Sequence, residues 1–324
     1  MNRRDMLQIS AALGVGVSLS RTALAAPQDE GRAATRVAAT AVTANGQTAT
    51  APQGQSAAAA KPLRVPADGV IPVAFLISEG AVVIDFAGPW AVFEDVEVRG
   101  PTRHPFRPYT VAESLAPVRA GSAMTIIPNY TLASAPAPKV VVIPAQSEPT
   151  EAVLAWVRNV ARTADVVMSV CTGAFLLAKT GLLSGKEATT HHSAYSEFAM
   201  AFPDIKVKRG ARFVDLGNIA SAGGLSSGID LALHVVERYF GRDVTSSSAY
   251  YLEYQGQGWM DPNSNSVYAQ ARISTAEHPL CPVCQMDVDQ ATSPRSTYQG
   301  KTYYFCMDAH KRLFDSSPEH FVSV

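Results

Sequence analysis

The sequence has few charged residues and no run of basic ones. Charged residues make up 17% of the 324 residues, and the formal net charge is −1. Proteins that bind nucleic acid need clustered Lys and Arg to neutralise phosphates. We therefore expect no nucleic-acid partner. Hydrophobic residues make up 47% of the chain, which is enough to build a sizeable core.

The sequence also lacks an apolar run long enough to cross a bilayer as a mature helix. A short run, from Ile9 to Leu19, follows Arg3-Arg4 and precedes Ala23-Leu24-Ala25, which is the order found in a cleavable export signal. The paired arginines resemble those of twin-arginine signals. We predict a signal peptide over residues 1–25 and a periplasmic protein with no stable membrane span. An ordinary Sec signal or an uncleaved anchor is the alternative.

Two stretches lack the large apolar side chains that a folded core needs. Residues 26–69 consist largely of Ala, Thr, Gln and Pro, so we predict a disordered tether there. Residues 256–277 are polar and contain Gly, Pro, Asn and Ser, which predicts a linker. These stretches delimit two folded parts, an α/β domain over residues 70–255 and a compact module over residues 278–324.

Apolar strands alternate with helices in the larger part. The runs Val140–Ile143 and Val166–Val170 are continuously apolar, which is typical of strands covered on both faces. A further strand is expected over Pro72–Ile77, and helices are expected over Asp85–Val96, Glu151–Arg162, Thr172–Lys179 and Ser226–Phe240. The alternation predicts a flavodoxin-like three-layer α/β domain with a parallel sheet.

Cysteine is scarce, with four residues in the chain, and one of them lies between a predicted strand and a predicted helix. Cys171 is followed by Gly173-Ala174, small residues that suit the tight turn of a nucleophile elbow. The N-terminus of the following helix should lower the pKa of the thiol and offer N–H groups to a developing oxyanion. A small buried core cysteine is the alternative.

Five motifs around Cys171 resemble the ThiJ/PfpI superfamily, which has a class I glutamine-amidotransferase-like fold. In chain order they are Asp85-Phe-Ala-Gly88-Pro89, Ser169-Val-Cys-Thr-Gly-Ala-Phe175, Gly181-Leu-Leu-Ser-Gly185, Ala188-Thr-Thr-His191 and Ser221-Ala-Gly-Gly-Leu-Ser-Ser-Gly-Ile-Asp230. The similar branch is isonitrile-hydratase-like and is shared with the ligand domains of some AraC-type regulators. The resemblance implies chemistry at C–N bonds through Cys171.

The same resemblance implies three further site residues. Asp85 matches an acidic residue that lies against the sulfur, although its position also suits a helix N-cap. Thr172 is implied to assist the chemistry, or is only a good first-turn residue. His191 matches a frequent family histidine and is either a catalytic group or a structural hydrogen-bonder. His192 stands where that branch usually has Trp, which leaves the substrate open.

The other three cysteines have the spacing of metal ligands. Two residues separate Cys281 from Cys284, 21 residues separate Cys284 from Cys306, and three residues separate Cys306 from His310. Three thiolates and an imidazole suit zinc or cuprous copper. A disulfide is the alternative in an oxidising compartment, but it would leave one of the three cysteines unpaired.

The last residues resemble the YHS domain, a small β-hairpin-plus-helix module often attached to proteins that handle heavy metals. The motifs are Cys281-Pro-Val-Cys-Gln-Met286, Tyr298-Gln-Gly-Lys-Thr-Tyr-Tyr-Phe-Cys306 and Ser317-Pro-Glu-His-Phe321. The resemblance implies a metal-binding module over residues 278–324. Cys281 and Gln285 replace residues frequent in that family. Met286 either adds a thioether ligand or fills the core.

Together these patterns predict an exported, cysteine-dependent hydratase- or amidase-like enzyme coupled to a soft-metal module. The alternative is a non-catalytic periplasmic protein that binds metal or senses redox state. No helix-turn-helix pattern follows residue 255, so we do not expect a transcription factor. The expected partners are a small-molecule substrate and a metal ion, and a homodimer is left open.

Overall fold

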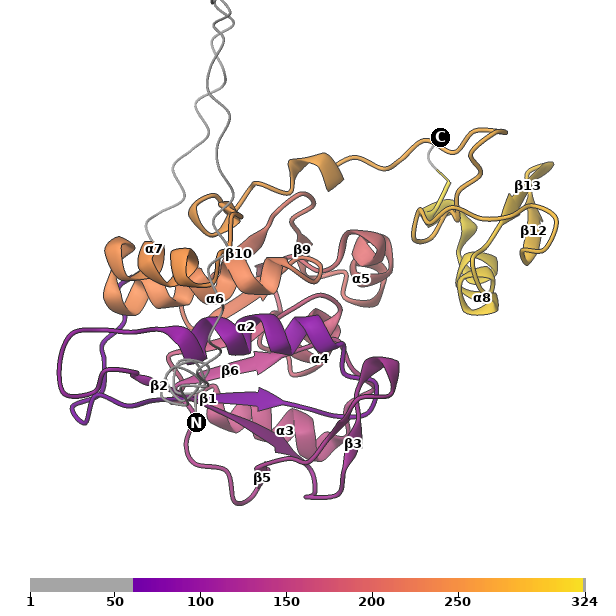
Figure 1. Cartoon of the computed structure of the whole chain (residues 1–324). Helices are drawn as coiled ribbons and strands as arrows, with labels where there is room; N and C mark the ends of the chain where they lie inside the picture. Colours follow the sequence, from indigo (N-terminus) through magenta and orange to yellow (C-terminus); the bar gives the residue numbers. More distant parts are fainter. Residues whose placement is uncertain (1–60, 323–324) are drawn as a thin grey trace, which may run out of the picture. The chain divides into compact units, whose positions relative to one another are not determined.

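Residues 61–322 are described by a computed structural model (Figure 1). The predicted signal peptide and most of the predicted tether lie outside these residues. In the described part of the chain, no helix is both long enough and apolar enough to span a membrane.

A seven-stranded sheet lies at the centre of the larger part, with the strand order β10-β11-β7-β6-β1-β2-β5. The β10–β11 pair is antiparallel and the other pairs are parallel. The predicted parallel sheet is therefore confirmed. The strands are β1 (Ile71–Leu76), β2 (Phe106–Ala112), β5 (Tyr130–Thr131), β6 (Val140–Ile143), β7 (Val166–Ser169), β10 (Phe213–Asp215) and β11 (Ile219–Ala222).

Helices cover both faces of this sheet (Figure 1). Successive strand residues point to opposite faces, so Val73 and Phe75 pack in one core, and Ala74 and Leu76 pack in the other. The first core is completed by α2 (Val83–Asp95), α6 (Ser227–Phe240) and α7 (Arg242–Tyr251). The second is completed by α3 (Glu151–Val160), α4 (Gly173–Lys179) and α5 (Tyr195–Ala201). This is the predicted three-layer domain.

Short elements join these strands and helices. Two-residue strands form two small pairs, and single 3-10 turns mark several loops. They are β3 (Val118–Arg119), β4 (Thr125–Ile126), β8 (Glu187–Ala188), β9 (Lys206–Val207), η1 (Gly121–Ala123), η2 (His192–Ala194), η3 (Gly258–Met260) and η4 (Ser266–Tyr268).

The last part of the chain is a small α+β module, as predicted. A hairpin of β12 (Arg295–Tyr298) and β13 (Lys301–Tyr304) precedes α8 (Asp308–Ser316) and η5 (Pro318–His320). Among the residues that the structure describes, its buried hydrophobic cluster has five members, namely Cys281, Val283, Cys284, Phe305 and Phe314. A core of this size gives little hydrophobic stabilisation by itself.

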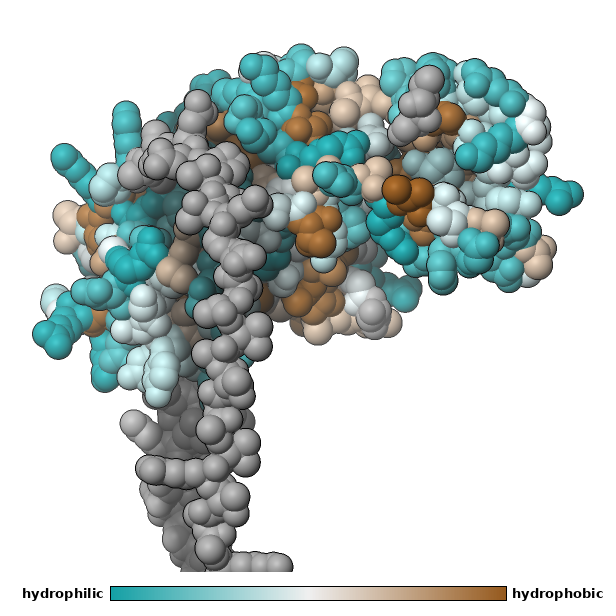
Figure 2. Space-filling model, turned by 90° about the horizontal axis from the view of Figure 1, so that it is seen from above, coloured by the Kyte–Doolittle hydropathy of each residue, from teal (hydrophilic) through white to brown (hydrophobic). Residues whose placement is uncertain are grey.

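On the face seen in Figure 2, hydrophilic side chains are interspersed with smaller hydrophobic patches. The most exposed large hydrophobic side chains are Ile273, Tyr250, Val267 and Ile127, which are 85%, 81%, 78% and 70% exposed. Two of these four, Val267 and Ile273, lie in the predicted linker.

Candidate functional site

The strand-to-helix turn at Cys171 has the backbone geometry predicted for a nucleophile elbow. Cys171 lies between β7 and α4 with φ of +57°, a left-handed conformation that costs a non-glycine residue about 1–2 kcal/mol. Its backbone is held on both sides, because its N–H donates to the Gly223 carbonyl at 2.9 Å and its carbonyl accepts from the Thr190 hydroxyl at 2.9 Å.

A glycine just after the elbow allows strand and helix to approach closely. A Cβ atom built on Gly173 would lie 2.2 Å from the Ile143 carbonyl oxygen, far inside any van der Waals contact. Because Ile143 ends β6, the first turn of α4 packs directly on the end of the neighbouring strand. A larger residue at position 173 would displace the helix that carries the elbow.

Asp85 lies in the first turn of α2 and is fully buried. Its Oδ2 accepts a hydrogen bond from the Ala145 N–H at 3.1 Å. The N-cap of α2 is Val82, with no side-chain cap, so the N-cap alternative for Asp85 is wrong. Burial raises the pKa of Asp85 to about 6, although hydrogen bonds from Ala145 and from Cys171 oppose this rise.

Three groups besides Asp85 face the sulfur of Cys171. They are the backbone N–H groups of Thr172 and Leu225 and the side chain of Thr172, and all of them favour the thiolate. Burial and then the charge of Asp85 outweigh them and raise the pKa of Cys171 to about 12. The predicted lowering of this pKa is therefore wrong. Cys171 is only 8% exposed, and desolvation opposes ionisation of its thiol more than the helix N-terminus favours it.

The side chain of His191 caps its own turn. Its Nδ1 accepts from the Ser193 N–H at 3.2 Å and lies 2.7 Å from the Ser193 hydroxyl. Its ring packs against Gly224, where an added Cβ would lie 2.2 Å from Cδ2. Burial, followed by the nearby His192, lowers the pKa of His191. These are the contacts of a structural histidine, and its catalytic role stays a prediction.

Leu225 is a site residue that sequence reasoning missed. It lies in the turn before α6 with φ of +46°, and its N–H faces the Cys171 sulfur. The signal in the sequence was Gly223-Gly224, because paired glycines ahead of a helix often mark a backbone that approaches another group closely.

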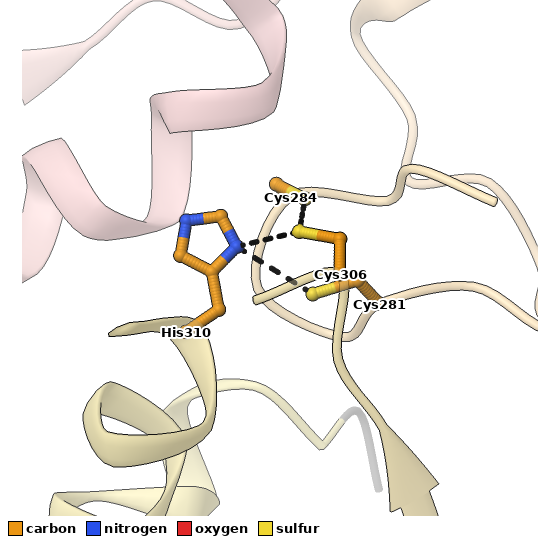
Figure 3. Close-up of side chains that lie close together, drawn as sticks. All are labelled: Cys281, Cys284, Cys306 and His310. Atoms are coloured by element: carbon orange, nitrogen blue, oxygen red, sulfur yellow. Dashed lines mark hydrogen bonds between the residues drawn. The ribbon is translucent and has the colours of Figure 1, made fainter. Parts of the chain in front are cut away.

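A second cluster lies in the C-terminal module and contains the four predicted metal ligands (Figure 3). The ligand atoms of Cys281, Cys284, Cys306 and His310 all lie within 4.8 Å of one another. His310 Nδ1 is 3.1 Å from Cys306 Sγ and 3.7 Å from Cys281 Sγ, and the Cys284 and Cys306 sulfurs are 3.5 Å apart. Ligands about 2.0–2.3 Å from a tetrahedral ion would lie roughly 3.5–3.8 Å apart. The cluster therefore fits one soft metal ion.

The backbone shapes this cluster. Cys281 and Cys284 lie on a tight turn in which the Gln285 N–H donates to the Cys281 carbonyl at 2.8 Å, and Gln285 has φ of +62°. A hydrogen bond from Cys284, together with nearby backbone N–H groups, lowers the pKa of Cys281, which favours the thiolate that metals bind. All four cysteines of the chain are unbonded to one another. Met286 is 55% exposed, so it does not fill the core.

Each of the two folded parts matches a known family model. The DJ-1/PfpI family model matches residues 72–238. The chain belongs to the DJ-1/PfpI family. The YHS domain model matches residues 281–324. The isonitrile hydratase of Pseudomonas putida is 30% identical over 218 residues, which cover 65% of this chain and 90% of that protein.

Regulators and solved structures are also similar to this DJ-1/PfpI-family chain. The HTH-type transcriptional regulator CdhR of Pseudomonas aeruginosa is 29% identical over 140 residues, 42% of this chain and 41% of the regulator. A ThiJ/PfpI family protein from Pseudomonas syringae has a TM-score of 0.51 and 26% identity, covering 58% of this chain and 76% of its own. Drosophila melanogaster DJ-1beta, at 18% identity and a TM-score of 0.51, covers 58% of this chain and all of its own, and shares the fold.

Proposed function

We propose that this protein is a cysteine-dependent enzyme of the hydratase or amidase type, in which Cys171 attacks an electrophilic carbon bonded to nitrogen. The observation that carries the proposal is the convergence of a buried carboxylate, Asp85, and the Thr172 side chain on one sulfur. The 30% identity to an isonitrile hydratase supports the choice of substrate class.

Asp85 is the base that this site needs. Because burial raises the pKa of Cys171 to about 12, the sulfur carries its proton at neutral pH and requires a partner that removes it. Asp85, with a pKa of about 6, is ionised at neutral pH and lies near enough to the sulfur for its charge to act on that thiol. A carboxylate in contact with the nucleophile can take the proton as the new bond forms.

The proposed reaction with an isonitrile has two steps. In the first, Cys171 Sγ bonds to the terminal carbon, while Asp85 takes the thiol proton and passes it to that carbon, which gives a thioimidate. In the second, water adds to the same carbon, the carbon–sulfur bond breaks, and the sulfur regains a proton. One water is consumed and an N-substituted formamide is released. The N–H groups of Thr172 and Leu225 stabilise the charge on sulfur.

Turnover of an alkyl isonitrile, followed by NMR detection of the formamide, tests this proposal. We expect formamide from the full chain, loss of turnover with Cys171→Ser and a large decrease with Thr172→Val. Absence of turnover with isonitriles and with small amides, in protein whose Cys171 thiol is reduced, would overturn it.

One observation favours the non-catalytic alternative. Cys171 is 8% exposed and burial raises the pKa of its thiol, which are also properties of an unreactive core cysteine. Regulators such as CdhR are similar to part of this chain. A binding or sensing protein would show no turnover in the same assay and would not need the Asp85 carboxylate.

For the C-terminal module we propose the binding of one zinc or cuprous copper ion by Cys281, Cys284, Cys306 and His310. Four protein ligands close the site and leave no open position, so the ion would stabilise the module or be stored there rather than activate a substrate. Elemental analysis of the full chain tests this, with one metal ion per chain expected.

We also propose that the protein is exported to the periplasm by the twin-arginine route. The support is the sequence alone, namely Arg3-Arg4 ahead of the short apolar run and the small residues that follow it. This route carries folded proteins, so the metal could be bound before export.

A further inference from the structure

Part of the predicted linker is built into the α/β domain. We define residues 257–269 as the strap. Trp259 of the strap is buried, and the Pro262 carbonyl accepts a hydrogen bond from the Arg212 N–H at 2.6 Å. Asn265 is buried as well and donates from Nδ2 to the Ser227 hydroxyl at 3.3 Å. The strap therefore contacts the start of α6.

The guanidinium of Arg212 joins the strap to this helix. Its Nε donates to Asp230 Oδ2 at 2.6 Å, and its Nη2 forms an ion pair with the same oxygen at 2.5 Å. Its Nη1 donates to Asn265 Oδ1 at 3.0 Å, and its Nη2 donates to the Ser226 hydroxyl at 3.0 Å. The planar guanidinium group has enough N–H donors to bind the side chains of Asp230, Asn265 and Ser226 at the same time. The carboxylate of Asp230 is buried and also accepts from Tyr254 at 2.9 Å.

These contacts surround the turn of residues 223–227, which forms one side of the Cys171 site. The Gly223 N–H donates to the Arg212 carbonyl at 2.9 Å, and the Gly223 carbonyl accepts from the Cys171 N–H at 2.9 Å. Leu225, in the middle of the turn, has φ of +46°. A strained residue holds such a conformation only when its surroundings fix it, and Arg212 contacts the turn on both sides of Leu225.

We propose that Arg212 is a positioning residue for the cysteine: with Asp230 and Asn265 it locks the turn of residues 223–227, which holds the Cys171 backbone and directs the Leu225 N–H at the sulfur. The strap is thereby part of the Cys171 site, although it lies far along the chain. The inference does not depend on the proposed hydratase or amidase reaction, because its effect is on the thiol itself.

Replacement of Arg212 by lysine keeps the positive charge beside Asp230 and removes the fork. A lysine nitrogen cannot reach Asp230, Asn265 and Ser226 in the geometry of a guanidinium. The turn should then relax and the Leu225 N–H should leave the sulfur. Hydrogen bonds to charged groups are the stronger ones, so we expect the Cys171 thiolate fraction at a given pH to fall about tenfold.

Arg238 provides the matched control. It lies near the C-terminal end of α6, the helix that carries Asp230, and its Nη1 contacts Asp215 at 3.2 Å and the Gly217 carbonyl at 2.7 Å. Arg238→Lys therefore removes the same kind of interaction without touching the turn of residues 223–227. Both variants should lower the melting temperature, whereas only Arg212→Lys should change the thiol.

The experiment is iodoacetamide labelling of the full chain across a pH series, with mass spectrometry of the Cys171 peptide to separate it from the other cysteines. We expect the profile of Arg212→Lys to shift to higher pH, with labelling about tenfold slower at a fixed pH, and that of Arg238→Lys to match the unaltered protein. If Arg212→Lys does not fold, Asn265→Ala should give a smaller shift in the same direction. Equal shifts in the two lysine variants would overturn the proposal. Labelling of Arg212→Lys that is unchanged or faster would overturn it too. If Asn265→Ala is used as the substitute, the same outcomes apply to that variant.

Discussion

The side chains of Cys171 and Asp85 lie close enough in the interior of the α/β domain for each to shift the pKa of the other. The negative charge of Asp85 raises the pKa of the thiol in turn. The two groups therefore form one acid–base unit, which loses its first proton near pH 6 and keeps the second well above neutral pH. The charge of Asp85 therefore decreases the reactivity of the free Cys171 thiol, whereas catalysis requires that same carboxylate as a base.

The first prediction separates these effects with Asp85→Asn. Without the carboxylate charge, the pKa of Cys171 should fall, and labelling by iodoacetamide at pH 8 should become about tenfold faster. Turnover should be lost, because no base remains beside the thiol. Asp95→Asn, at the other end of α2, is the control and should change neither rate. Slower labelling in Asp85→Asn would contradict the acid–base unit.

The second prediction concerns stability against pH. Because burial raises the pKa of Asp85 from 3.8 to about 6, the folded state binds the proton more tightly than the unfolded state does. The stabilisation is complete below pH 3.8 and is lost as the pH rises through 6, a loss of roughly 3 kcal/mol. Asp85→Asn should not show this loss. Urea unfolding from pH 4 to pH 7 measures it, and parallel curves for the two proteins would argue against a raised pKa.

The third prediction concerns the glycine after the elbow. Gly173→Ala places a Cβ atom 2.2 Å from the Ile143 carbonyl oxygen, so α4 must move and the free energy of unfolding should fall by about 3 kcal/mol. Gly185→Ala is the control, because its φ is +72° but nothing lies within 4 Å, and it should cost only about 1 kcal/mol. Thermal unfolding of both variants gives the comparison. Equal losses of unfolding free energy in the two variants would mean that the close contact between position 173 and Ile143 does not contribute to stability.

Local sequence patterns predicted the elements that depend on neighbouring residues. The apolar run over Val140–Ile143 is β6 with the same bounds, because a strand buried on both faces needs continuous apolar residues. The helix predicted from Asp85 begins two residues earlier, at Val83, and Pro89 lies inside it. Proline favours a first turn, and here tertiary packing carries the helix through Pro89. α7 was missed, since its buried positions include the polar Thr245 and Ser248.

The two sites also differ in how far their residues are separated along the chain, and this decided which of them the sequence could predict. The metal ligands come as two closely spaced pairs, so their spacing alone predicted the cluster. The pairing of Asp85 with Cys171 was available only through the family resemblance, because the two residues are far apart in the chain. The Arg212–Asn265 contact joins residues 53 positions apart with no motif at either end, so no local pattern could have predicted it.

The fourth prediction concerns export. If Arg3-Arg4 form part of a twin-arginine signal, Lys-Lys in their place should leave precursor in the cytoplasm, while the unaltered protein reaches the periplasm with its N-terminus near Ala26. Cell fractionation and N-terminal sequencing measure both. A pair of lysines that leaves export unchanged would exclude this route and favour a Sec signal.

The fifth prediction concerns the metal. His310→Ala should remove about one metal ion per chain, because His310 Nδ1 lies 3.1 Å from Cys306 Sγ and supplies a ligand of the cluster. Cys284→Ser and Cys306→Ser should do the same. His320→Ala is the matched control, since His320 lies in the same module and its side chain is 57% exposed beside Glu319. Cys171→Ser should also keep the metal.

Removal of the metal should destabilise the module more than the α/β domain. The hydrophobic cluster of the module has five buried residues, two of which, Cys281 and Cys284, are predicted ligands, so we expect metal binding to supply much of the module's folding free energy. Hydrogen exchange of the full chain after chelation should therefore show lost protection in peptides from residues 281–322 and retained protection in the seven-stranded sheet. Equal protection of the module with and without metal, together with a disulfide among Cys281, Cys284 and Cys306, would mean that the cluster is structural and binds no ion.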